Sequence, residues 1–384
     1  MIQSKNLLPR CRLRDLGISI GNFPTGKFNA ITDVKGVKVG QTTLIQGDGR
    51  ITGKKAGPIR TGVTCILPGE NIFQEYITAG SFILNGAGEV SGLTQVTEWG
   101  TLETPILLTN TFSVGTCSSA MIHHLTEKYP SLGLEQDVII PIVGECDDSW
   151  LNNIAGSHLK QEHVISAMES AKTGPVQEGN VGGGTGMITC DFKGGIGTSS
   201  RKISMGNSFY TMGILVCSNF GDRKDLRIDG FPIGELLATK YKDITSRKDN
   251  YGSIIAVIAT DCPMSSHQLN RLCKRAALGI GKVGSYAAHG SGEIILAFST
   301  ANKTHRDNRD SLDRIKSIPD KKMNLFYSSI IEATQEAIMN ALCMGEDMYG
   351  INNHFSPALP LDDVKQIMTK YNTFKNSLYN DMVN

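Results

Sequence analysis

The chain has 384 residues, of which 40% are hydrophobic, enough to form one large hydrophobic core or two ordinary domains. Its 38 lysine and arginine residues are balanced by 37 aspartate and glutamate residues, which leaves a formal net charge of +1. This balance excludes the general attraction to nucleic acid or to an anionic membrane that a strongly basic protein has. We therefore expect a small-molecule partner, with no nucleic acid and no membrane involved.

The N-terminal segment and the cysteines bear on the cellular compartment. Residues 1–17 carry polar side chains where a secretory signal peptide needs an apolar stretch, and no later stretch approaches about 18 consecutive apolar residues. The nine cysteines form no CxxC pair and have no closely spaced histidine, so they indicate neither a zinc site nor a disulfide framework. We expect a cytoplasmic protein that uses no metal and no other cofactor.

Seven short apolar runs predict β-strands, and most of them contain no charged residue, which is typical of strands covered on both faces. They are residues 62–68, 81–86, 104–110, 137–144, 211–219, 252–260 and 293–300.

Three amphipathic patterns predict helices over residues 265–280, 324–344 and 361–378. Ser265 or Ser266 could cap the first of them. Because fully apolar strands need cover on both sides, we expect helices to sandwich β-sheets within a single α/β layered domain that spans the whole chain. The charged stretch 303–322 predicts a solvated excursion from this domain.

Gly252 and Ser253 lie between a polar connector, residues 241–250, and an apolar strand. For an isolated Gly-Ser pair, a turn is the ordinary explanation. If the bond between them were cut, however, Ser253 would carry both a hydroxyl nucleophile and a free α-amine. Such an amine titrates at about pH 8 and could act as general base for the hydroxyl. The same hydroxyl could make the cut by attacking the carbonyl of Gly252, which has no Cβ to crowd the attack.

Three further stretches contain candidate site residues. Ser291 and Glu293 are two apart at the start of a predicted strand and should point to one face, although a turn with a solvated carboxylate is the common alternative. Asn219 ends a strand, where it could be a turn residue or could donate its amide to a developing oxyanion. Residues 178–187 are rich in glycine but lack the GKS, GKT and GxGxxG patterns of nucleotide-binding loops, so tight backbone packing is expected there.

Taken together, these stretches closely resemble the DmpA and BapA family of N-terminal-nucleophile serine aminopeptidases, which includes L-aminopeptidase/D-amidase/esterases and β-peptidyl aminopeptidases. The resemblance extends up to about residue 345 and is carried by residues 14–21 (RDLGISIG), 29–44, 60–68, 84–93, 100–115, 178–187, 192–201, 252–263 and 290–302. It implies an αββα four-layer sandwich of the type shared with ornithine acetyltransferases. It also implies self-cleavage into chains 1–252 and 253–384, which stay together and assemble as a tetramer of the two-chain unit.

The resemblance assigns roles to individual residues. Ser253 would be the nucleophile, its amine positioned by Ser291 with Glu293 behind it. Asn219 would stabilise the tetrahedral oxyanion. Glu145 matches an acid that contacts the free amino end of the substrate, where a carboxylate would face an ammonium group; without the resemblance, a solvated acid in a polar loop is the simpler interpretation.

At one position the chain departs from part of the family. Some members carry a tyrosine two residues after the acid, and its hydroxyl supports the oxyanion, whereas this chain has Asp147 followed by Asp148. An ionised carboxylate cannot donate a hydrogen bond, so this contribution is in doubt, and the added negative charge could instead favour cationic amino termini. Trp150 could form a wall of the pocket or pack the loop.

We therefore expect a self-processing aminopeptidase or amidase that releases the N-terminal residue from short peptides, amino-acid amides or esters through a seryl acyl-enzyme on Ser253. One alternative is acyl transfer to an amine, as in the ornithine acetyltransferases, which use threonine at the cleavage point. The other is an unprocessed homologue without enzymatic activity.

Overall fold

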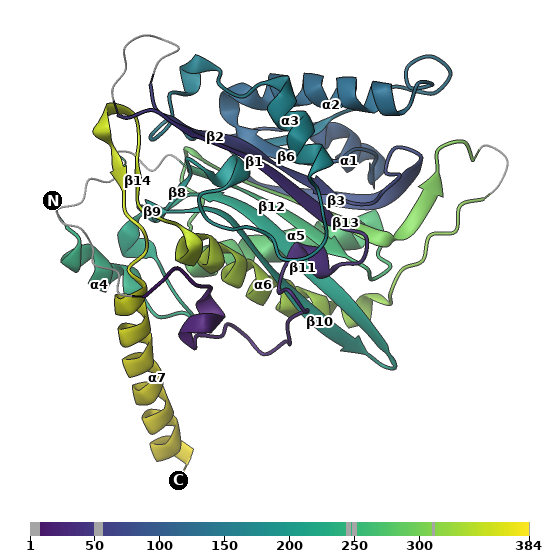
Figure 1. Ribbon diagram of the computed structural model, residues 1–384. Coiled ribbons are helices and arrows are strands. Elements are labelled where there is room, and N and C mark those ends of the chain that lie inside the picture. Colours follow the sequence, from purple (N-terminus) through teal and green to yellow (C-terminus); the bar gives the residue numbers. More distant parts are fainter. Residues whose placement is uncertain (1–7, 50–56, 243–246, 248–251, 309–311, 384) are drawn as a thin grey trace.

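Two large β-sheets lie face to face, and helices cover the outer face of each, which gives four layers (Figure 1). This is the expected αββα arrangement. The computed structural model describes residues 8–49, 57–242, 247, 252–308 and 312–383.

The first sheet has five strands in the order β1-β2-β6-β7-β4. Its outer face packs against α2 (Val114–Lys128) and α3 (Gln161–Glu169). The strands are β1 (Lys38–Gln46), β2 (Ile59–Leu67), β6 (Ile106–Asn110), β7 (Ile142–Cys146) and β4 (Val90–Ser91).

The second sheet has six strands in the order β10-β11-β12-β13-β3-β5, and α5 (Ser266–Val283) and α6 (Met323–Met344) cover its outer face. In this sheet β12 and β13 are parallel, whereas β11 and β12 are antiparallel. The strands are β10 (Gly195–Met205), β11 (Ser208–Asn219), β12 (Gly252–Thr260), β13 (Ser291–His305), β3 (Glu75–Gly86) and β5 (Thr101–Leu102).

Smaller elements complete the fold: α1 (Leu93–Trp99), α4 (Ile233–Lys240), and two short hairpins, β8 (Ile188–Thr189) with β9 (Phe192–Lys193) and β14 (Met348–Tyr349) with β15 (Phe355–Ser356). The C-terminal helix α7 (Leu361–Val383) extends away from the layered body (Figure 1). In the described part of the chain, none of the helices has the length and apolar character needed to cross a membrane.

The central strand β12 shows why its sequence is uniformly apolar. Ile254, Ala256 and Ile258 pack on the side of α5 and α6, whereas Ile255, Val257 and Ala259 pack between the two sheets. Successive side chains of a strand point to opposite faces, and here both faces are buried, so neither face tolerates a charge.

The predicted strand 252–260 has the observed bounds of β12, and Ser265 is the N-cap of α5, where its hydroxyl accepts a hydrogen bond from the Gln268 N–H at 3.3 Å. The predicted strand 137–144 is wrong in its first half, because β7 begins only at Ile142. Pro141, which precedes β7, has no N–H to give to a strand ladder. In the charged stretch 303–322, residues 303–305 extend β13, and most of the remaining described residues are exposed, as expected.

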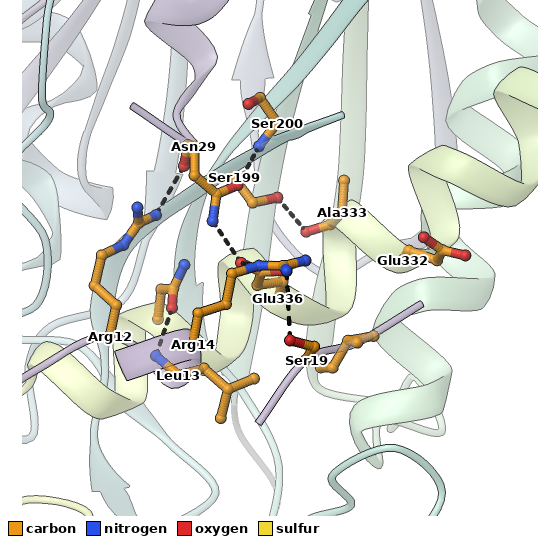
Figure 2. A network of polar contacts seen from close by, with 12 residues as sticks. Arg12, Leu13, Arg14, Ser19, Asn29, Ser199, Ser200, Glu332, Ala333 and Glu336 are labelled. Carbon is orange, nitrogen blue, oxygen red and sulfur yellow. Dashed lines mark hydrogen bonds and ion pairs between the residues drawn. The ribbon is translucent and has the colours of Figure 1, made fainter. Parts of the chain in front are cut away.

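A buried polar network ties the N-terminal segment to β10 and α6 (Figure 2). Arg14 donates two hydrogen bonds of 2.8 Å to the carboxylate of Glu336, and Arg201 donates a third, also of 2.8 Å. Asn29 donates to the same carboxylate. The side chains of Arg201 and Glu336 are fully buried. The network therefore joins residues that precede Gly252 in the sequence to a helix that follows it.

Candidate active site

A cavity of about 690 Å³ lies where β7 and β11 end and β12 begins. Its lining includes six residues singled out in the sequence: Glu145, Asp147, Trp150, Asn219, Gly252 and Ser253. These residues come from three segments that together span more than 100 positions of the sequence, so the two stacked sheets are what brings them together.

Ser253 is the second residue of β12 and is only 4% exposed. Strand alternation places its side chain on the same face as Ile255, between the two sheets. Its Oγ is buried beside the thiol of Cys146 and makes no hydrogen bond of ordinary geometry with the described residues. A buried hydroxyl without such a bond costs free energy, and such exceptions in native proteins often mark functional groups.

Gly252 is the first residue of β12, and residues 248–251 before it lie outside the described part of the chain. A Cβ at this position would lie 2.7 Å from the carbonyl oxygen of Asn219 and 2.8 Å from the Cα of Phe220. Backbone crowding therefore requires glycine directly before Ser253.

The side chain of Asn219 has a fixed orientation. Its Oδ1 accepts hydrogen bonds from the backbone N–H of Ile188 at 2.9 Å and from Nη1 of Arg247 at 3.2 Å. Its Nδ2 donates to the backbone carbonyl of Asp147 at 2.8 Å. Two donors on one side of the amide determine which end is the NH₂ group. Because Nδ2 has a second hydrogen, Asn219 has donor capacity beyond the bond to Asp147.

Ser291 and Glu293 lie on β13, the strand next to β12, where Ser253 is paired with the residue between them, Gly292. They share a face, as predicted: Oγ of Ser291 donates to Oε1 of Glu293 at 2.5 Å. The carboxylate is completely buried, which raises the pKa of Glu293, and its Oε2 has no partner in the described part of the chain.

Strand alternation also separates this pair from the nucleophile candidate. Ser291 and Glu293 lie on the same face of β13 as Ile295, which packs against α5 and α6. The Ser253 side chain lies on the opposite face of the sheet, toward the first sheet. The structure thus places the pair one strand away from Ser253 but without a hydrogen bond to its hydroxyl.

Glu145 is a buried strand residue and not a solvated acid in a loop. It lies in β7 and is 4% exposed. Its Oε1 accepts from the backbone N–H of Glu89 at 2.8 Å, and its Oε2 accepts from the hydroxyl of Thr111. Burial raises the pKa of Glu145, which these two hydrogen bonds partly offset. Glu145 therefore faces the cavity as a fixed acceptor.

Asp147 and Trp150, which follow Glu145 in the sequence, have different environments. Asp147 is exposed at the cavity, and its Oδ1 accepts from the backbone N–H of Ser149 at 2.8 Å. Trp150 stacks on the His354 ring with centroids 3.7 Å apart and an interplanar angle of 13°. Both aromatic residues line the cavity, so Trp150 forms a wall of the pocket as one of the two alternatives predicted.

Several cavity residues were not singled out in the sequence. Thr111 and Gly88 lie beside Glu145, and Arg247 contacts Asn219. Ile351 and His354 come from a C-terminal segment. Of these five, Thr111 and Gly88 lie in stretches that carry the family resemblance, as do the lining residues Ala87, Phe112 and Gly290, so the resemblance could have pointed to them.

The glycine-rich segment packs backbone against backbone, as expected. A Cβ at Gly183 would lie 2.4 Å from the carbonyl oxygen of Leu108, and one at Gly184 would lie 2.3 Å from the backbone nitrogen of Ile196. These close approaches place the segment against β6 and β10.

The chain matches known proteins along most of its length. The family model of peptidase family S58 matches residues 29–356. The beta-peptidyl aminopeptidase BapA of Sphingosinicella microcystinivorans is 42% identical over 372 residues, which cover 94% of this chain and 92% of that protein. BapA of Sphingosinicella xenopeptidilytica is 43% identical over 367 residues, 93% of this chain and 90% of that protein.

Solved structures agree with this match. The PH0078 protein from Pyrococcus horikoshii OT3 has a TM-score of 0.89 and 45% identity, with 94% of this chain and 99% of that chain covered. The L-aminopeptidase D-Ala-esterase/amidase from Ochrobactrum anthropi, described as a prototype for the serine aminopeptidases and a variant among the Ntn hydrolase fold, has a TM-score of 0.85 and 36% identity over 94% of this chain and 99% of that chain. This chain therefore belongs to peptidase family S58 and is a serine aminopeptidase with the Ntn-hydrolase fold.

Proposed function

We propose that the chain cleaves itself between Gly252 and Ser253, and that Ser253 then releases the N-terminal residue from short peptides, amino-acid amides or esters. The observation that carries this proposal is the hydroxyl of Ser253, which is buried at the cavity without a hydrogen bond of ordinary geometry, directly after a glycine that the fold requires.

Self-cleavage needs no residue beyond the scissile pair for its covalent steps. Oγ of Ser253 attacks the carbonyl carbon of Gly252, the C–N bond breaks, and the nitrogen takes up the hydroxyl proton, so an ester replaces the amide. Water then hydrolyses the ester, which returns the hydroxyl to Ser253 and leaves a carboxylate on Gly252. The products are chains 1–252 and 253–384, with a free α-amine on Ser253.

In the mature enzyme this amine acts as the general base. It accepts the proton of Oγ as Oγ attacks the substrate carbonyl, and it returns the proton to the leaving amine or alcohol. Water then hydrolyses the acyl-enzyme by the same route. Nδ2 of Asn219 supplies a hydrogen bond to the tetrahedral oxyanion in both steps.

Ser291 and Glu293 are proposed to position and tune the amine. In the intact chain the Ser253 nitrogen is a peptide nitrogen, so an interaction with its ammonium form can arise only after cleavage. The support is their place on the neighbouring strand and the unpartnered, buried Oε2 of Glu293. A carboxylate in this state has an acceptor site available for an ammonium group.

Glu145 is proposed to bind the free amino group of the substrate. Its carboxylate is anchored at the cavity by Thr111 and by the backbone of Glu89, so it can pair with an ammonium group without losing side-chain freedom on binding. The relatives are named as a beta-peptidyl aminopeptidase and an L-aminopeptidase D-Ala-esterase/amidase, and both names fit substrates with a free amino end. Asp147 adds a second negative charge at the same cavity.

The quaternary structure and the compartment are proposals of the same kind. We expect a tetramer of the processed two-chain unit, in the cytoplasm, without nucleic-acid or membrane partners. All nine cysteines are free in the structure, which agrees with a reducing compartment.

Mass spectrometry of the denatured protein tests the proposal directly. Wild type should give two chains that end at Gly252 and begin at Ser253, and Ser253→Ala should give one intact chain. The processed wild type should then hydrolyse amino-acid p-nitroanilides, with amino acid as the product even when an amine acceptor is added. A single wild-type chain would contradict self-processing, and a transfer product as the main product would favour acyl transfer.

A further inference from the structure

A fully buried lysine is connected by hydrogen bonds to Asn219, which lines the cavity. Lys193, in β9, has no exposed surface. Its Nζ donates hydrogen bonds to three backbone carbonyls, those of Met187 at 2.7 Å, Gly194 at 3.0 Å and Gly184 at 3.2 Å. Only the protonated amine has three donors, so this cage matches the ammonium form. Burial opposes that form and lowers the pKa of Lys193 to about 7.

The shortest of these bonds connects Lys193 to Asn219 through a single peptide group. The carbonyl of Met187 accepts from Lys193, and the N–H of the same peptide unit, which belongs to Ile188, donates to Oδ1 of Asn219 at 2.9 Å. The C=O and N–H of a trans peptide point in opposite directions, so the lysine and the asparagine lie on opposite sides of this unit. Nδ2 of Asn219 is the next donor in the series, and Asn219 lines the cavity.

Hydrogen bonds in such a series polarise one another. A positive charge at the Met187 carbonyl makes the Ile188 N–H a stronger donor, which draws electron density toward Oδ1 of Asn219. The Nδ2 hydrogens then become more acidic and donate more strongly to an anion. The same contacts fix the direction of the amide, since a rotated amide would set its NH₂ group against the Ile188 N–H.

We infer that Lys193 is a positioning residue for catalysis, which orients and polarises the Asn219 amide toward the oxyanion through the Met187–Ile188 peptide. This inference rests on the proposed function of Ser253 and Asn219. It concerns a residue that does not touch the substrate and acts only through Asn219.

A second cation also contacts Asn219 but is held differently. Arg247 donates to Oδ1 of Asn219 at 3.2 Å from the connector that ends at the proposed cleavage point. Lys193 lies in the hairpin of β8 and β9, and its backbone N–H donates to the carbonyl of Pro357 at 2.7 Å. Cleavage at Gly252 creates a new chain end near Arg247, whereas it leaves the backbone around Lys193 continuous.

The test compares Lys193→Met, which removes charge and donors, with Lys193→Gln, which keeps two neutral donors. In the processed fraction of each variant, kcat for an amino-acid p-nitroanilide should fall by about tenfold or more in Lys193→Met, less in Lys193→Gln, with KM within about twofold. In an Asn219→Ala background, Lys193→Met should change kcat by less than about twofold, because the group it acts through is gone.

Arg306→Met is the matched control for the loss of a buried cation. The Arg306 side chain is 4% exposed and forms an ion pair with Glu103. Arg306 directly follows the C-terminal end of β13, whereas the cavity lies near the N-terminal end of this strand. This variant should lose thermal stability without a change in kcat. It thus separates general destabilisation from the effect on Asn219.

The outcomes separate the inference from the proposed function. If wild type is processed and active and Asn219→Ala reduces kcat, but both lysine variants retain wild-type kcat, the role of Lys193 is refuted and the proposed function stands. The role of Lys193 is also refuted if Lys193→Met lowers kcat by the same factor in the wild-type and in the Asn219→Ala background. A purely structural role of Lys193 predicts that result. If Lys193→Met does not fold, Lys193→Gln alone carries the comparison. An inactive, uncleaved wild type would overturn both.

Discussion

Ser253 and Asn219 are directly opposed residues of the antiparallel strands β12 and β11. Opposed residues in such a pair have their Cα atoms about 4.5–5.5 Å apart. The strands run through the buried centre of the second sheet, so the sheet itself sets the spacing between the candidate nucleophile and the candidate oxyanion donor. Strand pairing alone therefore brings the two residues together, without any loop movement.

Asn219→Ala should lower kcat by about 100-fold or more, because it removes a hydrogen bond that strengthens only in the transition state. KM should change little, since the ground-state carbonyl depends less on this donor. Steady-state kinetics on the processed variant measure both values. A large rise in KM with unchanged kcat would assign Asn219 to substrate binding instead.

Gly252→Ala should slow self-cleavage. The new Cβ meets the Asn219 carbonyl oxygen and the Phe220 Cα at distances under 3.0 Å, so the backbone before Ser253 must shift away from its position in β12. A time course on denaturing gels should show more intact chain than in wild type. Gly281→Ala is the control, because nothing lies within 4 Å of a Cβ there, and it should be processed at the wild-type rate.

The sequence predicts β12 well because its two faces bury apolar side chains, a local pattern that needs no knowledge of the neighbours. β10 belongs to the same sheet and most of its residues are buried, but its sequence is not uniformly apolar. Its polar residues are satisfied by distant groups: Ser199 donates to the carbonyl of Ala333, and Arg201 donates to Glu336. Each partner lies more than 130 positions away, so no local window contains the information.

The same distinction applies to the site. Ser291 and Glu293 are predicted to share a face from their spacing alone, and they do. The contact of Glu145 with Thr111 depends on β6 and β7 being adjacent and parallel, which spacing does not reveal. Lys193 is hidden for another reason: a lysine in a short glycine-rich stretch predicts a solvated charge, and only its carbonyl partners explain why it is buried.

Glu145→Gln should raise KM for substrates with a free amino group, because a neutral amide replaces the carboxylate that faces the ammonium. The pH dependence gives a second check. The carboxylate must be ionised to bind, and burial raises the pKa of Glu145. In wild type, kcat/KM should therefore fall on the acid side at a higher pH than an ordinary glutamate would cause. In Glu145→Gln this fall of kcat/KM at acid pH should disappear. A fall at the same pH as in wild type would argue against the role of Glu145.

Glu336→Gln should destabilise the processed protein. Burial alone would raise the pKa of Glu336, but the hydrogen bond from Arg14 and the charge of Arg201 outweigh it and lower the pKa. A lowered carboxylate pKa contributes stability at neutral pH, and this stability is lost as pH falls through the folded-state value. Removing one partner of a buried ion pair costs about 3–5 kcal/mol, since the Arg201 guanidinium stays buried.

Because this network joins the proposed 1–252 and 253–384 chains, the loss should appear as a lower thermal midpoint and easier separation of the chains. Calorimetry and size-exclusion chromatography at neutral pH measure the two effects. Glu75→Gln is the matched control: the Glu75–Lys303 pair joins the same two chains at 2.6 Å, but both side chains are substantially exposed. An exposed pair contributes about 0–1 kcal/mol, so this control should remain close to wild type. Equal effects of the two substitutions would show that burial of the Glu336 network adds nothing to the association.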